Sequence, residues 1–161
     1  VALQSVKTPS TLALTRQNLP TVRTDNIDEN MCAYGAYELE TAGGDAQVTI
    51  FASGSEVEIA MAARDQLEKK GHPTRVVSVP CFELFKAQDD DYRNAIIGDA
   101  PVKLAIEAGV RQGWDAIIGS DGLFIGMDGF GASGKIEDLY RHFGITAEAA
   151  VAAVEARLQA G

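Results

Sequence analysis

Cysteine and histidine are scarce in this chain, and their scarcity excludes several kinds of site. Of 161 residues, only two are cysteines and two are histidines. Cys32 and Cys81 lie far apart, and neither has a second cysteine or a histidine beside it at the spacing of a zinc site. His72 and His142 lack a serine or cysteine partner nearby. We therefore expect two free thiols, a reducing compartment such as the cytoplasm, and no zinc site or histidine-activated nucleophile.

Long apolar runs and an excess of positive charge are also missing. The apolar stretch at residues 147–154 is interrupted by Glu148 and is far shorter than the roughly 20 residues that cross a bilayer. Fourteen Lys and Arg against 23 Asp and Glu give a net charge of −9, which repels nucleic acid and anionic lipid. We expect a soluble protein that binds neither nucleic acid nor membranes. An anionic metabolite would need a local cation or a helix N-terminus, and Arg16 is one candidate.

A starting methionine and a signal segment are absent as well, which we interpret as the mark of a piece of a longer protein. Residues 1–24 have the character of an appendage, in which a strand at residues 12–15 leads to a loop that begins with Arg16. Residues 25–34 are polar and uneven, as is typical of a linker. Residues 35–161 carry regular apolar patterns and are long enough for one folded domain.

The clearest pattern in that domain is a strand, a helix and a second strand. Residues 47–52 are apolar on both faces, as expected of an inner strand of a parallel sheet. A helix follows. Ser55 and Glu58 are expected to form a capping box at its start, and Gly71 is expected to end it. Residues 75–80 form the next strand. This unit predicts a parallel sheet with a right-handed crossover.

The remaining patterns extend this sheet and cover it. Residues 37–40 alternate apolar and charged side chains, as a half-exposed strand does. Ser133 and Thr146 are expected to cap the last two helices. Further elements are expected as two strands, at residues 102–107 and 123–127, and three short helical stretches, at 81–88, 90–97 and 114–117.

Three places in the domain have a functional and a structural interpretation. The loop Ser53-Gly54-Ser55-Glu56 joins a strand to a helix, and such a loop can bind an anion. It lacks a nucleotide-binding motif, however, and the negative charge of Glu56 itself complements the helix dipole, which favours a structural role in capping the helix. Glu107 ends a central strand, where it could act as a base or be a hydrogen-bonded or dimer-facing carboxylate. Gly126, Gly129 and Gly131 indicate close backbone approach, within the sheet or across a subunit contact.

Arg16 lies in the segment Leu14-Thr15-Arg16-Gln17-Asn18-Leu19. Its planar guanidinium suits a phosphate group, although a cation in a loop is also a common surface residue. Six further segments accompany this one, in this order: Ala52-Ser53-Gly54-Ser55-Glu56-Val57, Arg75-Val76-Val77-Ser78-Val79-Pro80, Glu107-Ala108-Gly109, Ile125-Gly126-Met127, Phe130-Gly131 and Phe143-Gly144-Ile145-Thr146. Together they resemble the transketolase family over nearly the whole chain.

This resemblance implies a fold and a role. The fold is that of the family's C-terminal domain, an α/β/α sandwich of three layers with a five-stranded, mostly parallel sheet whose first strand is antiparallel. The enzyme is a homodimer of the pentose phosphate pathway that moves a two-carbon ketol unit between sugar phosphates with thiamine diphosphate and Mg²⁺ or Ca²⁺. Residues 1–24 would be the tail of the pyrimidine-binding domain, and residues 35–161 the C-terminal domain. Arg16 matches the family arginine that binds the sugar phosphate.

The resemblance also implies what this chain does not carry. In the family the cofactor lies between the first two domains of opposing subunits, so the metal ligands and acid–base residues are expected outside this chain. Gly119-Ser120-Asp121-Gly122 departs from the family's metal motif, and no asparagine follows Asn94, so a turn is expected there. We expect a non-catalytic fragment with no cofactor or metal residues, which contributes to dimerisation and packs against the remaining domains.

Two other interpretations stay open at this point. The chain could belong to a related thiamine enzyme, either deoxyxylulose phosphate synthase or a 2-oxoacid dehydrogenase β subunit. It could instead be a free-standing regulatory module that binds an anion at residues 53–56. Sequence upstream of this chain would separate the enzymes, and titration with phosphate would test the module.

Overall fold

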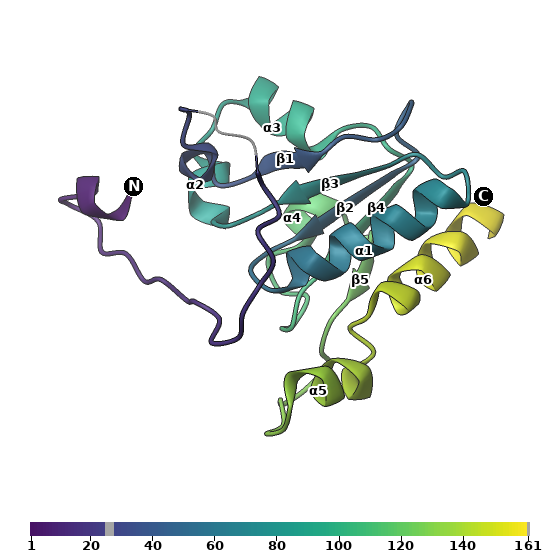
Figure 1. Cartoon of the computed structure of the whole chain (residues 1–161). Helices are drawn as coiled ribbons and strands as arrows, with labels where there is room; N and C mark the ends of the chain where they lie inside the picture. The colour runs from purple at the N-terminus through teal and green to yellow at the C-terminus, as the bar shows by residue number, and fades with distance from the viewer. Residues whose placement is uncertain (25–27, 161) are drawn as a thin grey trace.

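A five-stranded sheet lies at the centre of the computed structural model, which describes residues 1–24 and 28–160 (Figure 1). The strands are β1 (Tyr37–Glu40), β2 (Val48–Ala52), β3 (Thr74–Ser78), β4 (Val102–Ile106) and β5 (Leu123–Ile125). Their order in the sheet is β1-β3-β2-β4-β5. Three neighbouring pairs are parallel, whereas β1 runs antiparallel to β3.

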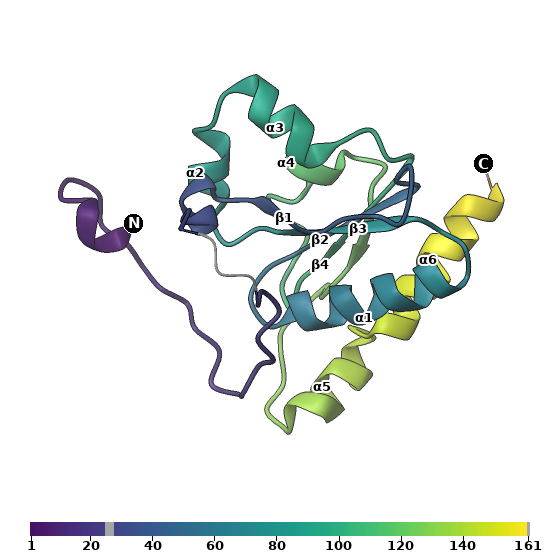
Figure 2. The same ribbon diagram turned by 45° about the horizontal axis from the view of Figure 1, so that its top comes forward.

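Helices cover both faces of the sheet. They are α1 (Glu56–Lys69), α2 (Phe82–Lys86), α3 (Asp90–Ile97), α4 (Asp115–Ile118), α5 (Ile136–Phe143) and α6 (Ala147–Ala160). In Figure 2, α1, α5 and α6 lie on one side of the sheet, and α2, α3 and α4 lie on the other. The predicted three-layer α/β/α sandwich, with a mostly parallel sheet and one antiparallel strand, is confirmed. Within the described residues, none of the helices combines the length and the apolar character needed to cross a membrane.

The central strands are buried on both faces because a helix layer lies on each side. All five residues of β2 are buried. Successive side chains of a strand point to opposite faces. On one face Ile50 packs in a core with Leu67 of α1 and Val154 of α6. On the other face Phe51 shares a second core with Trp114, which is only 1% exposed.

Helix α1 forms where the sequence predicts it but starts differently. The predicted capping box of Ser55 and Glu58 is wrong, because Ser55 has helical dihedral angles (φ −68°, ψ −25°) and its side chain caps no amide. A capping serine needs extended backbone to reach the first-turn amides. The Ser55 hydroxyl donates instead to the Glu56 carboxylate at 2.9 Å. Gly71 ends the helix with φ +86°, as predicted.

The two predicted caps near the C-terminus have different outcomes. Thr146 caps α6, since its Oγ1 accepts a hydrogen bond from the Ala149 amide at 3.2 Å. Ser133 does not cap α5, which begins at Ile136 after Lys135 in the N-cap position and has no side-chain cap. Gly134 and Lys135 therefore place the serine too early to serve this helix.

Close backbone approach is confirmed at one of the three glycines singled out above. A Cβ on Gly126 would lie 2.3 Å from the Phe124 ring and 2.8 Å from the Glu107 carbonyl oxygen. On Gly129 it would meet nothing within 4 Å, and on Gly131 only Met127 at 3.8 Å. Within the chain the prediction is wrong for these two glycines, and a subunit contact there stays a prediction.

Residues 1–24 form an arm with little regular structure. It contains one short 3-10 helix, η1 (Ala2–Gln4), which stands away from the sheet (Figure 1), whereas residues 19–22 lie beside the domain. The predicted strand at residues 12–15 is wrong, since these residues are irregular and exposed. A strand needs a neighbour to pair its backbone groups, and no strand of the sheet takes this segment. Of the predicted linker, residues 25–27 lie outside the described residues, and its end forms η2 (Met31–Tyr34).

Candidate functional site

The carboxyl ends of the parallel strands form the edge at which open α/β proteins bind ligands. The chain passes from β2 to β3 on one side of β2 and then to β4 on the other side. The direction in which successive strands are added to the sheet therefore reverses at β2. Ser53 directly follows β2, and Glu107 directly follows β4. The Ser53 hydroxyl donates a hydrogen bond to Glu107 Oε2 at 2.7 Å. The fold thus brings together two residues that sequence analysis singled out separately.

The environment of Glu107 favours its uncharged form. Burial raises the pKa of the Glu107 carboxyl, and the neighbouring Glu56 carboxylate raises it further, whereas the hydrogen bond from Ser53 lowers it. Of the two roles predicted for Glu107, the hydrogen-bonded carboxylate is confirmed by this geometry. The role as a catalytic base stays a prediction, because an accepted hydrogen bond from a serine hydroxyl is compatible with either role.

A second carboxylate at this edge belongs to Glu56, the first residue of α1, which is only 3% exposed. It accepts hydrogen bonds from the hydroxyls of Ser55 and Tyr140. The Tyr140 hydroxyl also lies 3.0 Å from Ser55 Oγ. Burial and the Glu56 carboxylate together raise the pKa of Tyr140, so the phenol keeps its proton and remains a donor.

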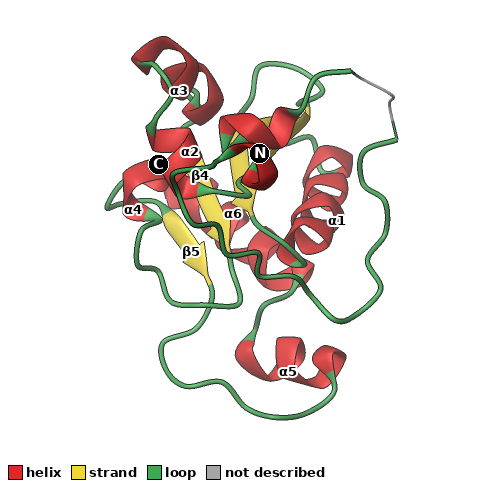
Figure 3. Ribbon diagram, turned by 90° about the vertical axis from the view of Figure 1, so that its left-hand side faces the viewer, coloured by secondary structure: helices red, strands yellow, loops and turns green. Residues whose placement is uncertain are grey.

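These contacts attach α5 to the rest of the domain. In Figure 3, α5 lies at the lower end of the molecule, away from β5 and α4. Tyr140 is the residue through which α5 hydrogen-bonds to the start of α1. The pair Glu56 and Tyr140 was missed by sequence analysis. One feature of the sequence could have revealed this pair. Ile136, Leu139, Tyr140 and Phe143 recur at the spacing of the buried face of a helix, and a phenol hydroxyl on such a face needs a hydrogen-bond partner.

The same contacts decide between the two interpretations of the loop at residues 53–56. Its serine hydroxyls are engaged by Glu107, Glu56 and Tyr140. An anion bound at this loop would also meet the buried Glu56 carboxylate, which is unfavourable at short range. The arrangement therefore favours the structural interpretation, in which these groups join β2, β4, α1 and α5.

Arg16 does not take part in this cluster. It is exposed in the arm, and no hydrogen bond or ion pair joins it to another residue in the described ranges 1–24 and 28–160. Its guanidinium is thus available to a ligand or to another part of a larger protein. Nothing in the fold of residues 35–160 positions it.

The turn at residues 119–122 is closed by an arginine. Arg111 donates to the carbonyl oxygens of Gly119 at 3.0 Å, Ser120 at 3.3 Å and Gly122 at 2.9 Å. A guanidinium at these oxygens leaves no place for a metal cation, so the segment is a turn, as predicted. Within the part of the chain that the structure describes, no group of three Cys, His, Asp or Glu could hold a metal ion. The described residues therefore offer no such cluster to the metal ion that accompanies thiamine diphosphate in the family.

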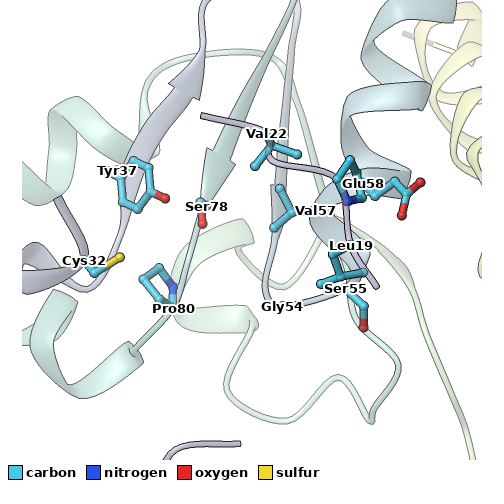
Figure 4. A pocket seen from close by; sticks show the side chains of 11 residues that line it. Leu19, Val22, Cys32, Tyr37, Gly54, Ser55, Val57, Glu58, Ser78 and Pro80 are labelled. Atoms are coloured by element: carbon cyan, nitrogen blue, oxygen red, sulfur yellow. The ribbon is translucent and has the colours of Figure 1, made fainter. Parts of the chain in front are cut away.

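A separate pocket of about 240 Å³ opens between the arm and the domain (Figure 4). It lies beside the start of α1 and the end of β3, and residues 19–22 of the arm form part of its wall. The pocket is lined by Leu19, Pro20, Val22, Cys32, Tyr37, Gly54, Ser55, Val57, Glu58, Ser78 and Pro80. The two cysteines are free thiols, and Cys32 is exposed.

Comparison with known proteins gives consistent results. Residues 35–146 match the family model described as the transketolase-like TK C-terminal domain. A transketolase from Cereibacter sphaeroides is 51% identical over 158 residues, which are 98% of this chain and 24% of that protein. A solved transketolase variant from Pichia stipitis has a TM-score of 0.83 and 32% identity over 96% of this chain and 22% of that one. A Pichia stipitis transketolase in complex with sedoheptulose-7-phosphate has a TM-score of 0.76 and 31% identity over 87% of this chain and 20% of that one.

The chain spans about a quarter of the length of the curated relative described above. The family match covers all five strands and the helices α1 to α5, and the similarity to whole transketolases extends through α6 and the arm as well. From the fold and from these similarities together, we conclude that the chain belongs to the transketolase family and corresponds to its C-terminal domain region.

Proposed function

We propose that this chain works as the C-terminal part of a transketolase, which transfers a two-carbon ketol unit between sugar phosphates. Identity of 51% to a named transketolase over nearly the whole chain is the observation that carries this proposal. The same similarity favours transketolase over deoxyxylulose phosphate synthase and the 2-oxoacid dehydrogenases. In the parent enzyme thiamine diphosphate would supply the reacting carbon and Mg²⁺ or Ca²⁺ would hold its diphosphate, and in this proposal both bind to domains other than this one.

In this proposal the chain itself contributes packing and dimerisation rather than bond-making groups. Residues 1–24 are the tail of the pyrimidine-binding domain, residues 25–34 are a linker, and residues 35–161 are the C-terminal domain. The apolar side chains of the arm support this division, because Leu3 is 99% exposed and Leu14 is 79% exposed. Side chains of this kind are stabilised when another surface covers them. The remaining domains of the enzyme would supply that surface in a homodimer of the cytoplasm.

Arg16 is the one residue of the chain to which we assign a substrate contact. Its guanidinium can donate two parallel hydrogen bonds to a phosphate group, and the described structure leaves it exposed for that purpose. The phosphate lies at the end of the sugar remote from the reacting carbon, so Arg16 holds the substrate in register with the cofactor. Its role is positioning, with no proton or electron pair transferred.

Steady-state kinetics of the intact enzyme with Arg16→Ala test this assignment. Hydrogen bonds to a charged group contribute about 1.5–3 kcal/mol, so KM for phosphorylated sugars should rise roughly 10- to 100-fold while kcat changes less. An unphosphorylated ketose should be used equally well by both enzymes. Arg141→Ala is the matched control, because Arg141 is also exposed and has only a 3.8 Å ion pair to Asp138. An unchanged KM for phosphorylated sugars in Arg16→Ala would show that Arg16 does not bind the phosphate.

A further inference from the structure

A small polar pocket lies at the amino-terminal edge of the sheet. Its volume is about 40 Å³, and it is lined by Pro101, Lys103, Ile118, Asp121, Gly122 and Arg157. Pro101 directly precedes β4 and Gly122 directly precedes β5, so this edge is opposite to the one that carries Ser53 and Glu107. One water molecule needs roughly 10–15 Å³ of such space. The pocket therefore has room for a few waters, or for a tetrahedral oxyanion whose outer oxygens stay in solvent.

Two cations reach this pocket from different parts of the fold. Lys103 belongs to β4, whose four other residues are buried and apolar. Arg157 belongs to the last turn of α6. A charged side chain in an apolar inner strand is unfavourable unless its head finds water or a partner. The head of Lys103 lines the same pocket as the Arg157 guanidinium.

These two cations are exceptions in a domain where arginines pair with carboxylates. Ion pairs join five of its six arginines to acidic residues, namely Arg64, Arg75, Arg93, Arg111 and Arg141. The sixth, Arg157, forms no ion pair with residues 1–24 or 28–160, and neither does Lys103. Acidic residues outnumber basic ones in this chain, so the unpaired state of both cations does not reflect a shortage of carboxylates.

Most hydrogen-bond donors of the two cations are unused. Lys103 Nζ donates to the Ala100 carbonyl oxygen at 3.4 Å, and Arg157 donates to the Asp121 carbonyl oxygen at 2.9 Å. An ammonium group has three donors and a guanidinium has five. The nearby carbonyl oxygens of residues 119, 120 and 122 already accept hydrogen bonds from Arg111. The groups in excess at this pocket are therefore donors, and an occupant has to be an acceptor.

The local charge selects a negatively charged acceptor. Asp121 is the one acidic residue among those that line the pocket, and two cations stand against it. Its carboxylate leans toward its own turn, because a Cβ on Gly119 would lie 3.0 Å from Asp121 Oδ1. Charges farther away than about 8–10 Å are largely screened at physiological salt. The excess of positive charge at the pocket thus outweighs the net charge of −9 that the whole chain carries.

We propose that this pocket binds a phosphate group, either as inorganic phosphate or as the terminal group of a small phosphomonoester. Lys103 and Arg157 donate charge-assisted hydrogen bonds to its oxygens. An occupant joins β4 and the turn before β5 to the end of α6, and so holds this helix to the sheet. The inference is independent of the proposed transketolase activity, because the site does not use Arg16 and lies at the edge opposite to the carboxyl ends of the strands.

Titration of the ¹⁵N-labelled 161-residue chain with inorganic phosphate and with glycerol 3-phosphate, followed by amide chemical shifts, tests the site. The ionic strength is held constant with NaCl, so that simple screening does not change during the titration. We expect a dissociation constant on the order of millimolar, with shifts at Lys103, Asp121 and Gly122. Equal affinities would assign the site to the phosphate group alone, whereas tighter binding of the ester would assign it to a phosphorylated metabolite.

Variants separate this site from unspecific attraction of anions. Lys103→Met and Arg157→Gln should each weaken phosphate binding about tenfold, the effect of losing a charge-assisted hydrogen bond. Asp121→Asn should tighten it about two- to fivefold, since a repelling charge is removed. Lys86→Met removes an exposed cation outside the pocket, and Arg16→Ala removes the proposed substrate contact, so neither should change the binding.

The substitution of Asp121 keeps the proposal testable even where Lys103→Met does not fold, because Asp121 is exposed. The proposal is overturned if phosphate shifts none of these amides at roughly twenty times the expected constant. It is equally overturned if a folded Lys103→Met binds phosphate as Lys86→Met does, or if Asp121→Asn binds it more weakly than the unchanged chain.

Discussion

Removal of the Tyr140 hydroxyl is the most informative single change in the domain. Tyr140→Phe deletes one of two hydroxyls that hydrogen-bond to the Glu56 carboxylate, and Glu56 is only 3% exposed. A hydrogen bond to a charged group contributes about 1.5–3 kcal/mol, and partial exposure of Tyr140 reduces this to about 1–2 kcal/mol. For a chain of this length the melting temperature should fall by about 3–6 °C.

Thermal and urea unfolding, followed by circular dichroism, measure this effect. Tyr34→Phe is the matched control, because Tyr34 also donates to a glutamate, Glu29, but does so at an exposed position. The control should change stability little, since exposed contacts of this kind contribute little. Equal effects of the two substitutions, or no effect of Tyr140→Phe, would refute the conclusion that burial makes the Glu56 contact important. A double variant with Glu56→Gln should show that the two effects are not additive.

Two further substitutions test other parts of the fold. Gly126→Ala should destabilise the domain by about 1–3 kcal/mol in urea unfolding, because its Cβ would lie 2.3 Å from the Phe124 ring, whereas Gly129→Ala, with open space around it, should be nearly neutral. Similar effects of the two would contradict this packing. Glu107→Gln should become more stable relative to the unchanged chain as the pH rises from about 4 to 7: burial raises the folded pKa of Glu107, so the unchanged chain loses stability as that carboxyl ionises. A pH-independent difference in unfolding free energy between the two proteins would contradict the raised pKa.

The regular elements could be predicted from sequence because their causes are local. The apolar run of β2, the apolar spacing of α1 and the left-handed Gly71 each depend on neighbours in the sequence. The position of Glu107 at a strand end follows from the same patterns. The sequence could predict that Ser53 and Glu107 lie at the same edge of the sheet, but it could not predict the hydrogen bond between them, since they are 54 positions apart.

The incorrect predictions have causes that sequence patterns do not contain. Residues 12–15 have the composition of a strand, but a strand forms only where a partner strand is available. Ser55 and Glu58 have the spacing of a capping box, but the backbone at Ser55 is already helical. The contact of Tyr140 with Glu56 joins two helices far apart in the chain, so only the folded structure brings it into view.

The central claim is that this domain supports a ketol transfer whose reacting groups lie in other parts of the enzyme. The most direct measurement is steady-state turnover by the 161-residue chain supplied with thiamine diphosphate, Mg²⁺ and a pair of sugar phosphates, beside the intact enzyme under the same conditions. We predict no turnover by the chain at any concentration and full turnover by the intact enzyme. Turnover that increases in proportion to the concentration of the chain alone would contradict the account.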